Sequence, residues 1–425
     1  MWALRAERRT GASRAAFGAA RVARGAWLRA LIAIGIAPVT FACGRDGGGG
    51  APVRAGEPSA AREPQAASAP SVVWTVSDAP VVDIGAEGQG PTHELYQVRG
   101  AYRLSDGRLV VANAGSRELR FYGETGEYLG AAGRRGEGPG EFRWIDSLFV
   151  VADDSLVVVE NTRGPLLTVF DREGTYRRSF RLDTDRFHWV VGVFSTGEVV
   201  ALRGGGIRQL APGEALPEGE QLSLASFRSD GSPRGTLVQL PVSVSYRKKY
   251  GRVDIGLPAP FHPEPWWSVR GGWLAAGYSD RYEIGIYDPE GRRLRTVSRE
   301  RVAEPVIARS VAQYRAMYGR WESPEAARLL EEILDQAELP EHLPAFGRLW
   351  LDDLGTLWVQ DYTVDPVADP GDWTVFDHAG RAVARVRLPA RFRITHIDEA
   401  FVTGVVRDSL DVEHVVVYRL TRRDR

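Results

Sequence analysis

The stretch "VFDREGTYRRSFRL", Val169–Leu182, decides the fold. Apolar and polar residues alternate on both sides of a short turn that ends in Gly174. Alternation with a period of two is typical of a half-buried β-strand, and a glycine in the turn supplies the positive φ that many chain reversals need. The stretch therefore predicts a β-hairpin.

The same hairpin recurs along the chain. In each copy a strand ends in an aromatic residue, and a turn closed by glycine follows. The copies are "FYGETG" ending at Gly126, "VFDREG" at Gly174, "SFRSDG" at Gly231, "IYDPEG" at Gly291 and "VFDHAG" at Gly380. Recurrence of one supersecondary unit indicates a repeat architecture.

A second pattern precedes the first and consists of a polar turn followed by a strand. Its six copies are "SDGRLVVAN" (105–113), "ADDSLVVVE" (152–160), "STGEVVALR" (195–203), "RGGWLAAGY" (270–278), "DLGTLWVQD" (353–361) and "DEAFVTGVV" (398–406). The two patterns together describe a four-stranded antiparallel unit. The final unit lacks its second hairpin, because the chain ends after "HVVVYRLTRRDR".

The strand "SVVWTVSDAP", Ser71–Pro80, has no unit of its own and can supply the missing fourth strand. Four-stranded units cannot bury both faces alone, whereas radial packing buries them and leaves short edges. We therefore expect an all-β, six-bladed β-propeller over residues 71–425, with the N-terminal strand closing the last blade. A β-sandwich is the alternative for a chain of short strands, and the repeat favours the propeller.

One segment breaks the β pattern. Apolar residues between 304 and 344 recur at helical spacing, and Ser323 followed by Pro324 is a helix-start signal. We expect a two-helix insertion at residues 303–344 on the face that carries the long loops.

The stretches "GRRGEGPGEF" (133–142), "VFDREG" (169–174) and "GTLWVQDY" (355–362) resemble those of NHL-type six-bladed propellers, in particular the lipid-anchored or secreted bacterial ones. The resemblance covers residues 71–425 and implies the fold much more strongly than a function. The first stretch lacks the Gly-Lys-Ser/Thr ending of a phosphate-binding loop. It is therefore expected to connect the first two blades.

Residues 1–42 are expected to be a signal peptide. Arginines precede the apolar run "ALIAIGIAPVTFAC", which is too short to span a bilayer and ends at Cys43. "TFAC" resembles a bacterial lipobox, although Thr40 and Phe41 depart from its usual pattern. We expect lipidation of Cys43 and a flexible tether over residues 43–70; plain secretion and an uncleaved anchor are the alternatives. The protein would be exported to the cell envelope, at the outer membrane or periplasmic face, touching the membrane through its lipid alone.

Composition excludes several classes of function. The formal net charge is −1, so no global field draws the protein to nucleic acid. Cys43 is the sole cysteine, which rules out a disulfide framework or a cysteine-based metal site within one chain. Lys248 and Lys249 are the only lysines. We expect a monomer without a nucleic-acid partner.

A propeller places its long loops on one face, and long loops on a rigid scaffold commonly carry function. The candidate ligand-binding residues lie at the ends of the second strands. They are Asn113, Arg117, Glu160, Asn161, Arg163, Arg203, Tyr278, Asp280, Arg281, Asp361, Tyr362, Arg407 and Asp408. Guanidinium and carboxylate groups together suit a polar ligand such as a peptide or sugar. Salt bridges between blades are the structural alternative.

The expected function is therefore that of a binding or scaffold module for a peptide, glycan or protein partner, rather than that of an enzyme. The alternative is a metal-dependent hydrolase or lyase of the lactonase type, in which Glu160, Asn161, Asn113 and Asp361 would surround a central metal. No cofactor and no metal site are expected. Calcium at the acidic loops 183–188 and 365–372 is a minor alternative, because neither loop matches an EF-hand.

Overall fold

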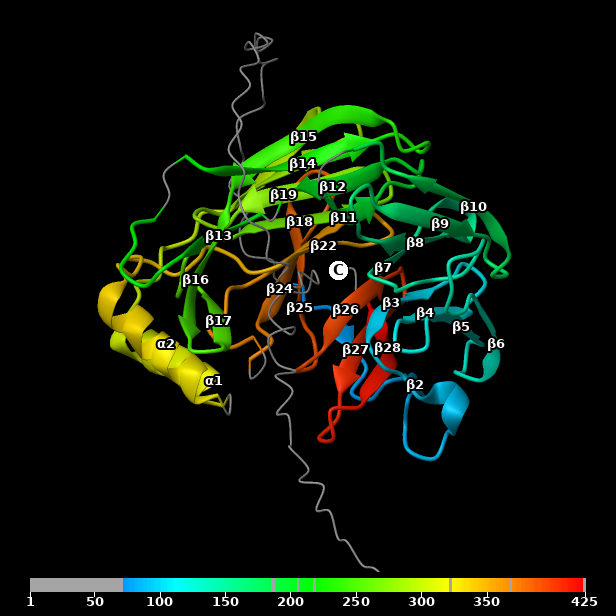
Figure 1. Ribbon diagram of the computed structural model, residues 1–425, viewed down its shortest axis with the longest axis horizontal. Coiled ribbons are helices and arrows are strands. Elements are labelled where there is room, and N and C mark those ends of the chain that lie inside the picture. The colour runs from blue at the N-terminus through cyan, green and yellow to red at the C-terminus, as the bar shows by residue number, and fades with distance from the viewer. Residues whose placement is uncertain are drawn as a thin grey trace, which may run out of the picture. The chain divides into compact units, whose positions relative to one another are not determined.

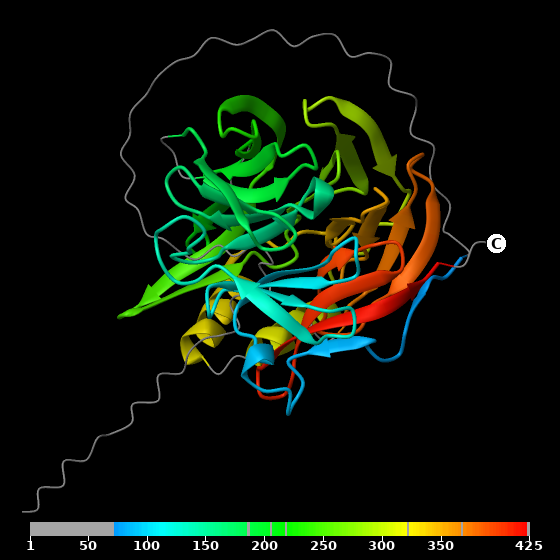
Figure 2. The same cartoon turned by 90° about the vertical axis from the view of Figure 1, so that its right-hand side faces the viewer.

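The computed structural model describes residues 72–422, with gaps at 185–187, 205, 217–218, 321–322 and 367–368. This part of the chain is mostly β-structure and contains two α-helices (Figures 1 and 2). None of its helices has the length and apolarity needed to cross a membrane. The predicted signal peptide, Cys43 and the tether lie outside the described residues.

Antiparallel sheets follow one another along the chain, with hydrogen-bonded neighbours mostly in chain order. The first sheet has β3 (Val98–Arg103), β4 (Leu109–Asn113), β5 (Glu118–Tyr122) and β6 (Tyr128–Ala132). The second has β7 (Ser147–Val150), β8 (Leu156–Glu160), β9 (Leu166–Phe170) and β10 (Tyr176–Arg181). The third has β11 (His188–Val193), β12 (Val199–Arg203), β14 (Gln221–Phe227) and β15 (Pro233–Pro241).

The fourth sheet has β18 (Pro265–Arg270), β19 (Trp273–Tyr278), β20 (Glu283–Tyr287) and β21 (Arg293–Ser298). The fifth has β22 (Leu349–Leu351), β23 (Leu357–Gln360), β24 (Asp372–Phe376) and β25 (Ala382–Arg387). The sixth has β26 (Arg393–Ile397), β27 (Phe401–Arg407) and β28 (Glu413–Thr421), to which β1 and β2 add. Two 3-10 turns, Pro91–His93 and Ala152–Asp154, complete the regular elements.

Neighbouring sheets share their cores. The first strand of each sheet, here called its inner strand, contacts inner strands of other sheets: β3 contacts β7 and β26, and β18 contacts β11 and β22. One apolar cluster joins the first and second sheets, another the second and third, and another the sixth and first. In a sandwich two sheets would share a single core. The arrangement is instead consistent with a β-propeller.

Burial changes across each sheet. All residues of β4 and β8 are buried, whereas β6 and β10 are mostly exposed or half-buried. A strand covered on both faces should be continuously apolar, and an edge strand can be polar. The valine-rich "LVVVE" and the arginine-rich "YRRSFR" follow this rule.

The sheets have two distinct sides. On the side here called the turn side, short turns join the first strand to the second and the third to the fourth. On the loop side lie the connections between the second and third strands and those that lead to the next sheet. The longest connections are on the loop side, and one of them includes both α-helices.

The outer strand of the sixth sheet comes from the N-terminal end of the described chain. β1 (Thr75–Val76) and β2 (Val82–Ile84) both pair antiparallel with β28. The sequence predicted one strand over residues 71–80, so its second half was placed too early. The two strands are separated by a turn that contains Pro80, which lacks the N–H that a continuous ladder would use.

Three further strands lie outside these six sheets and form an additional sheet. β13 (Ile207–Leu210) pairs in parallel with β16 (Ser243–Tyr250), which pairs with β17 (Val253–Pro258). The sequence reading treated these segments as loops. The helices α1 (Ala308–Gly319) and α2 (Pro324–Gln336) follow β21, and α2 packs on β16 and β17. These five elements are called the cap (Figure 1).

The helices match their sequence signals. The Ser323 hydroxyl accepts a hydrogen bond from the Ala326 N–H at 3.2 Å, which caps α2. Leu329, Leu330 and Ile333 form its buried face. An ion pair of 2.5 Å between Lys248 and Glu332 links α2 to β16.

The connection "GRRGEGPGEF" leads from β6 to β7, as predicted. Gly133 has φ 78°, and a Cβ there would lie 2.2 Å from the Phe142 ring. Phe142 is fully buried between the first and second sheets. Glycine is therefore required for close packing and for the backbone conformation, not for phosphate binding.

Candidate functional site

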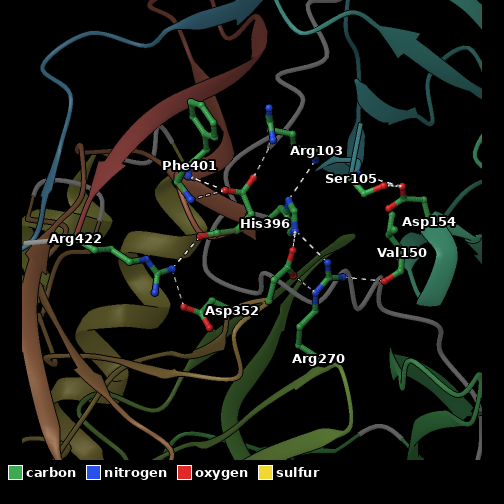
Figure 3. A network of polar contacts seen from close by, with 12 residues as sticks. Arg103, Ser105, Val150, Asp154, Arg270, Asp352, His396, Phe401 and Arg422 are labelled. Atoms are coloured by element: carbon green, nitrogen blue, oxygen red, sulfur yellow. Dashed lines mark hydrogen bonds and ion pairs between the residues drawn. The ribbon is translucent and has the colours of Figure 1, made fainter. Parts of the chain in front are cut away.

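Arg270, the last residue of β18, organises a network at the turn side (Figure 3). Its Nη1 donates to the Val150 carbonyl at 2.8 Å, and its Nε donates to Asp353 Oδ1 at 2.5 Å. Its Nη2 lies 3.0 Å from His396 Nε2. These partners belong to the second, fifth and sixth sheets, so Arg270 lies across the centre where the inner strands meet.

His396 and Asp353 complete this turn-side network. His396 Nε2 lies 2.8 Å from Asp353 Oδ2, and its Nδ1 accepts the Arg103 N–H at 3.2 Å. Burial acts to raise the pKa of Asp353, but the hydrogen bond and charge of His396, followed by those of Arg270, hold that pKa well below its usual range. Tyr102 packs against both Arg270 and His396. The turn side is thus closed by side chains.

On the loop side the inner strands begin, and buried polar groups join the first and sixth sheets. The Val98 carbonyl accepts a hydrogen bond from Arg393 Nη2 at 2.9 Å. The Val98 N–H donates to Glu413 Oε2 at 2.7 Å. The other oxygen of Glu413 accepts from Arg407 Nη2 at 2.7 Å.

Three guanidinium groups lie at the beginnings of neighbouring inner strands and are called the inner arginines: Arg99, Arg348 and Arg393. Burial lowers the pKa of Arg348. Burial also lowers the pKa of Arg393 to about 10; the charges of Arg99, Arg348 and Arg407 add to the decrease, and Glu413 opposes it. A cluster of partly buried positive charges such as the inner arginines is a candidate ligand-binding site.

Two carboxyl groups lie near the start of the second sheet. Asp146 Oδ2 accepts the Asn161 N–H at 2.7 Å, and Glu160 Oε2 lies 3.7 Å from Arg143 Nε. Burial raises the pKa of both carboxyl groups. Among the described residues, Glu160 Oε2 is buried without a hydrogen-bond partner.

Several predicted site residues hold the backbone in place. Asn113 Oδ1 accepts the Tyr96 N–H at 2.8 Å, and Asn161 Oδ1 accepts the Val190 N–H at 2.9 Å. Asp408 Oδ1 accepts two backbone N–H groups of its own turn, from Leu410 and Val412. These three side chains therefore bind backbone groups rather than forming the salt bridges between blades that the sequence offered as the alternative.

Other predicted residues are distributed around the loop side. Asp361 pairs with Arg385 at 3.2 Å, and Arg407 pairs with Glu413 and Asp411. Arg281 is 74% exposed and lies 3.7 Å from Asp280. Arg117 is half-buried, and Arg163 and Arg203 are exposed. In the described part of the chain, Asn113, Glu160, Asn161 and Asp361 have separate partners, and no contact brings them together around a metal.

Among the residues that the structure describes, no group of three or more His, Cys, Asp or Glu side chains is placed to hold a metal ion. In the acidic loop at 365–372, Asp369 and Asp372 both pair with Arg387. The carboxylates that sequence reading offered to calcium there are thus engaged with a guanidinium group.

Tyr278 and Tyr362 lie near a carboxyl group that the sequence reading did not select. Glu264 is deep in the fold just before β18, although it keeps partial exposure. Burial raises the pKa of Tyr278 to about 12, and Asp280 and Glu264 add to that increase. Burial also raises the pKa of Tyr362, with Glu264 as the next contribution.

α1 brings two more tyrosines to this cluster. Tyr314 and Tyr318 are buried with ring centroids 4.9 Å apart, and the charge of Glu264 acts on both. The Tyr314 hydroxyl donates to the Pro258 carbonyl at 3.1 Å, at the end of β17. The cap thus joins the body of the protein through a tyrosine cluster around one carboxyl group.

A cavity of about 100 Å³ shares Tyr278 with this cluster. His262, Gln221, Val242 and Val244 also line it. Polar lining and this volume suffice for water. The cavity lies where the third and fourth sheets meet the cap.

The Glu264→Gln substitution is expected to change how stability depends on pH. Burial raises the pKa of Glu264 from 4.5 to about 7, opposed by a weak hydrogen bond from Ser243. The folded protein keeps this proton in a pH range where the unfolded chain has lost it, so stability falls from about pH 4.5 to about pH 7. Glutamine cannot ionise, so above pH 7 the variant should be more stable by roughly 3 kcal/mol.

Urea unfolding between pH 4 and pH 8.5 measures this difference. Glu283→Gln is the matched control, because Glu283 is exposed in the same sheet and only 3.8 Å from Arg281. Its stability should follow that of the wild type at every pH. Parallel curves for Glu264→Gln and the wild type would contradict the buried, protonated state of Glu264.

Sequence reasoning missed Glu264 and the inner arginines. Glu264 lies in "HPEPWW", 262–267, where no periodic pattern indicates that its carboxyl group is buried. Tyr314 and Tyr318 lie in the segment predicted to be helical, but nothing local shows that they approach Glu264. For the arginines the available signal was their position at the beginning of an inner strand.

No protein-family model and no curated protein sequence matches the chain. Similar solved structures include a member of the DUF4221 family from Bacteroides vulgatus, with 10% identity, 82% of this chain and 98% of that chain covered, and a TM-score of 0.48. A protein from Bacteroides fragilis has 8% identity, coverage of 83% and 96%, and a TM-score of 0.45.

Regucalcin from Agrobacterium tumefaciens, a calcium-binding protein, has 10% identity, coverage of 83% and 97%, and a TM-score of 0.37. Similarities at these levels carry no information on the function of this chain. Its architecture is therefore described from its own sheets and contacts.

Proposed function

We propose that the chain is a six-bladed β-propeller of the cell envelope that binds a protein, peptide or glycan partner through its loop side. The N-terminal strands β1 and β2 close the last blade, and the two-helix insertion forms part of the binding side. We also propose that the propeller is of the NHL type. In this proposal the signal peptide ends at residue 42, the tether ends at residue 70, and the helical insertion spans residues 303–344.

The proposed number of blades, six, is supported by the agreement between the six sequence repeats and the six sheets. Each of the six turn-and-strand patterns in the sequence supplies the second strand of a different sheet. The inner strand β26 of the sixth sheet contacts β3 of the first, which closes the series. The extra sheet of β13, β16 and β17 belongs to the cap and is not counted as a blade.

The distribution of exposed apolar side chains is the observation that carries the binding function. Thirteen large hydrophobic side chains are exposed among the described residues, and one of them, Leu354, lies on a turn-side connection. Seven lie on loop-side connections: Tyr96, Trp144, Val253, Val302, Ile307, Leu410 and Val412. Exposed apolar groups with polar neighbours are typical of interaction surfaces. The loop side is therefore the side that a partner would cover.

The proposed location rests on the sequence. A basic leader, an apolar run and the lipobox-like "TFAC" support export and lipidation at Cys43. A lipid anchor at Cys43, followed by a flexible tether, would leave the loop side free to bind a partner. No described element adds a second membrane contact to this proposal.

The metal-dependent alternative has no specific observation in its favour. The side-chain oxygens of Asn113 and Asn161 already accept backbone N–H groups, and Asp361 is paired with Arg385. A metal would have to displace these bonds before it gained the ligands that the lactonase-type reading requires.

Site-specific photo-cross-linking in cells tests the proposed function. A photoreactive phenylalanine analogue at Tyr96 or Leu410 should form a cross-link to the same partner, because both side chains are exposed on the loop side, at 62% and 81%. Matched positions are Leu354, 43% exposed on the turn side, and Leu294, 44% exposed on β21.

The pattern of cross-links decides the outcome. Products at Tyr96 and Leu410, and none at the two matched positions, would support the loop-side interface. Equal products at all four positions would show nonspecific proximity. Products restricted to Leu354 would place the interface on the turn side and contradict the proposal.

A further inference from the structure

The inner arginines have a common place in the fold. Arg393 begins β26, Arg99 is the second residue of β3, and Arg348 directly precedes β22. All three therefore lie at loop-side ends of inner strands, in the fifth, sixth and first sheets. Arg393 donates a hydrogen bond to the carbonyl of Val98, the residue before Arg99. The Arg393 side chain therefore reaches from the sixth sheet to the first.

The backbone around Arg99 is irregular. The pairing of β3 with β4 shifts register between Val98 and Gly100, which makes Arg99 the extra residue of a β-bulge. A bulge changes the direction of a side chain and is common beside functional sites. Here it occurs next to the residue whose carbonyl and N–H are held by Arg393 and Glu413.

The nearby carboxyl groups are already engaged. Glu413 accepts hydrogen bonds from the Val98 N–H and from Arg407. Asp146, which interacts electrostatically with Arg99, accepts the Asn161 N–H. Among the described residues, the Arg348 guanidinium has no ion pair or side-chain hydrogen bond. Arg393 interacts electrostatically with Arg99, Arg348 and Arg407 and with one carboxylate, Glu413.

Like charges in a partly dehydrated site repel one another and lose hydration, so such a site is stabilised by a counter-ion. A guanidinium is planar and presents paired donors that match the oxygens of a carboxylate or phosphate. The same groups stay half-exposed, so a small ligand can reach them from the loop side. The turn side is closed by the network around Arg270.

We propose that the inner arginines form an oxyanion-binding site that receives a carboxylate or phosphate group of the ligand. This inference rests on the proposed function, because it gives the chemistry of the group that enters from the loop side. The contacts come from Arg348 and Arg393, with Arg99 adding positive charge. Glu413 holds the Val98 backbone that positions Arg393.

Thermal unfolding of the full chain in inorganic phosphate, in glutarate and in chloride of equal ionic strength tests the site. Phosphate, glutarate or both should raise the melting temperature in a saturable manner. Arg348→Gln should weaken the apparent affinity about tenfold or more, because a charge-assisted pair of hydrogen bonds is lost. The preferred probe identifies whether the natural group is a phosphate or a carboxylate.

Two variants complete the test. Arg135→Gln removes an exposed arginine of the loop-side connection 133–142 and should leave the effect of the anion unchanged. Arg393→Gln is the second site variant and should weaken binding if Arg348→Gln does not fold. In chloride alone, Arg348→Gln should melt at a higher temperature than the wild type, since an unbalanced charge is removed.

The site would be contradicted if neither anion stabilised the wild type beyond chloride, or if Arg348→Gln and Arg393→Gln both kept the wild-type affinity. Because small anions need no partner, a positive result here with no loop-side cross-links would contradict the proposed function alone. Loop-side cross-links without an anion effect would contradict this inference alone.

Discussion

The Trp74→Ala substitution is expected to lower the free energy of unfolding by about 3–5 kcal/mol, as for large aromatic residues removed from a core. Trp74 is 7% exposed and packs 6.0 Å from Trp358, centroid to centroid, in the cluster shared by the fifth and sixth sheets. Its backbone N–H donates to the Arg385 carbonyl, and the Arg422 guanidinium lies 4.7 Å from its ring. Chemical unfolding measures the loss.

The size of this effect follows from the position of Trp74. The residue precedes β1, and the segment around it pairs with β28 on one side and contacts β25 on the other. Removing the indole leaves a cavity at the place where the N-terminal segment holds two sheets together. Trp144→Ala is the matched control, because Trp144 is 40% exposed and should cost less than about 1 kcal/mol. A loss for Trp74→Ala as small as that for Trp144→Ala would show that the pairing of the N-terminal segment with the last sheet contributes little to stability.

The second large effect is expected for Arg270→Ala, which should cost about 2–4 kcal/mol. The substitution removes donors to Val150 and Asp353 and leaves the Asp353 carboxylate with His396 as its remaining side-chain partner in the network. The Arg270 side chain is 20% exposed, so solvent replaces little of what is lost. Denaturant unfolding at neutral pH provides the measurement.

Arg281→Ala in the same sheet is the control for Arg270. Arg281 is 74% exposed, and its acidic neighbours are 3.7 and 3.8 Å away. Exposed pairs of this kind contribute little, so its loss should stay within about 0.5 kcal/mol. A loss as small for Arg270→Ala would mean that the turn-side network does not join the sheets energetically.

The hairpins could be predicted from sequence because their signals are local. "VFDREG" contains both the end of β9 and the glycine that the turn requires, and Gly174 has φ 81° as that signal implies. The helices were also predictable, since Ser323 and the apolar spacing that follows lie within one segment. Local chemistry determines such elements before any distant contact forms.

The extra sheet of the cap could not be predicted in the same way. β13 has four residues, and its pairing with β16 is parallel and brings together segments from different connections. β16 carries Lys248 and Lys249, which weaken the apolar alternation. The strands form because tertiary neighbours supply hydrogen-bond partners, and this information is absent from each segment taken alone.

The candidate site residues also divide into those that local sequence can identify and those that only tertiary contacts define. The residues chosen at the ends of second strands lie at those ends or on the connections that follow, but Asn113, Asn161 and Asp408 bind backbone groups. The environment of Glu264 depends on α1, which comes later in the chain. The inner arginines stand among many arginines of similar local context, and only the closing of the sheets distinguishes them.

The pairing of β1 and β2 with β28 also has a kinetic consequence. The Ser77 hydroxyl accepts a hydrogen bond from the Arg419 N–H, across 342 residues of chain. A contact of this separation forms late, because the entropy of closing so long a loop must be lost before the contact contributes. During synthesis the segment that holds Trp74 is made long before β28 and cannot pair until β28 follows it. The rate-limiting step of folding is therefore expected at this junction, and a chain interrupted before β28 would expose an unpaired strand to its neighbours.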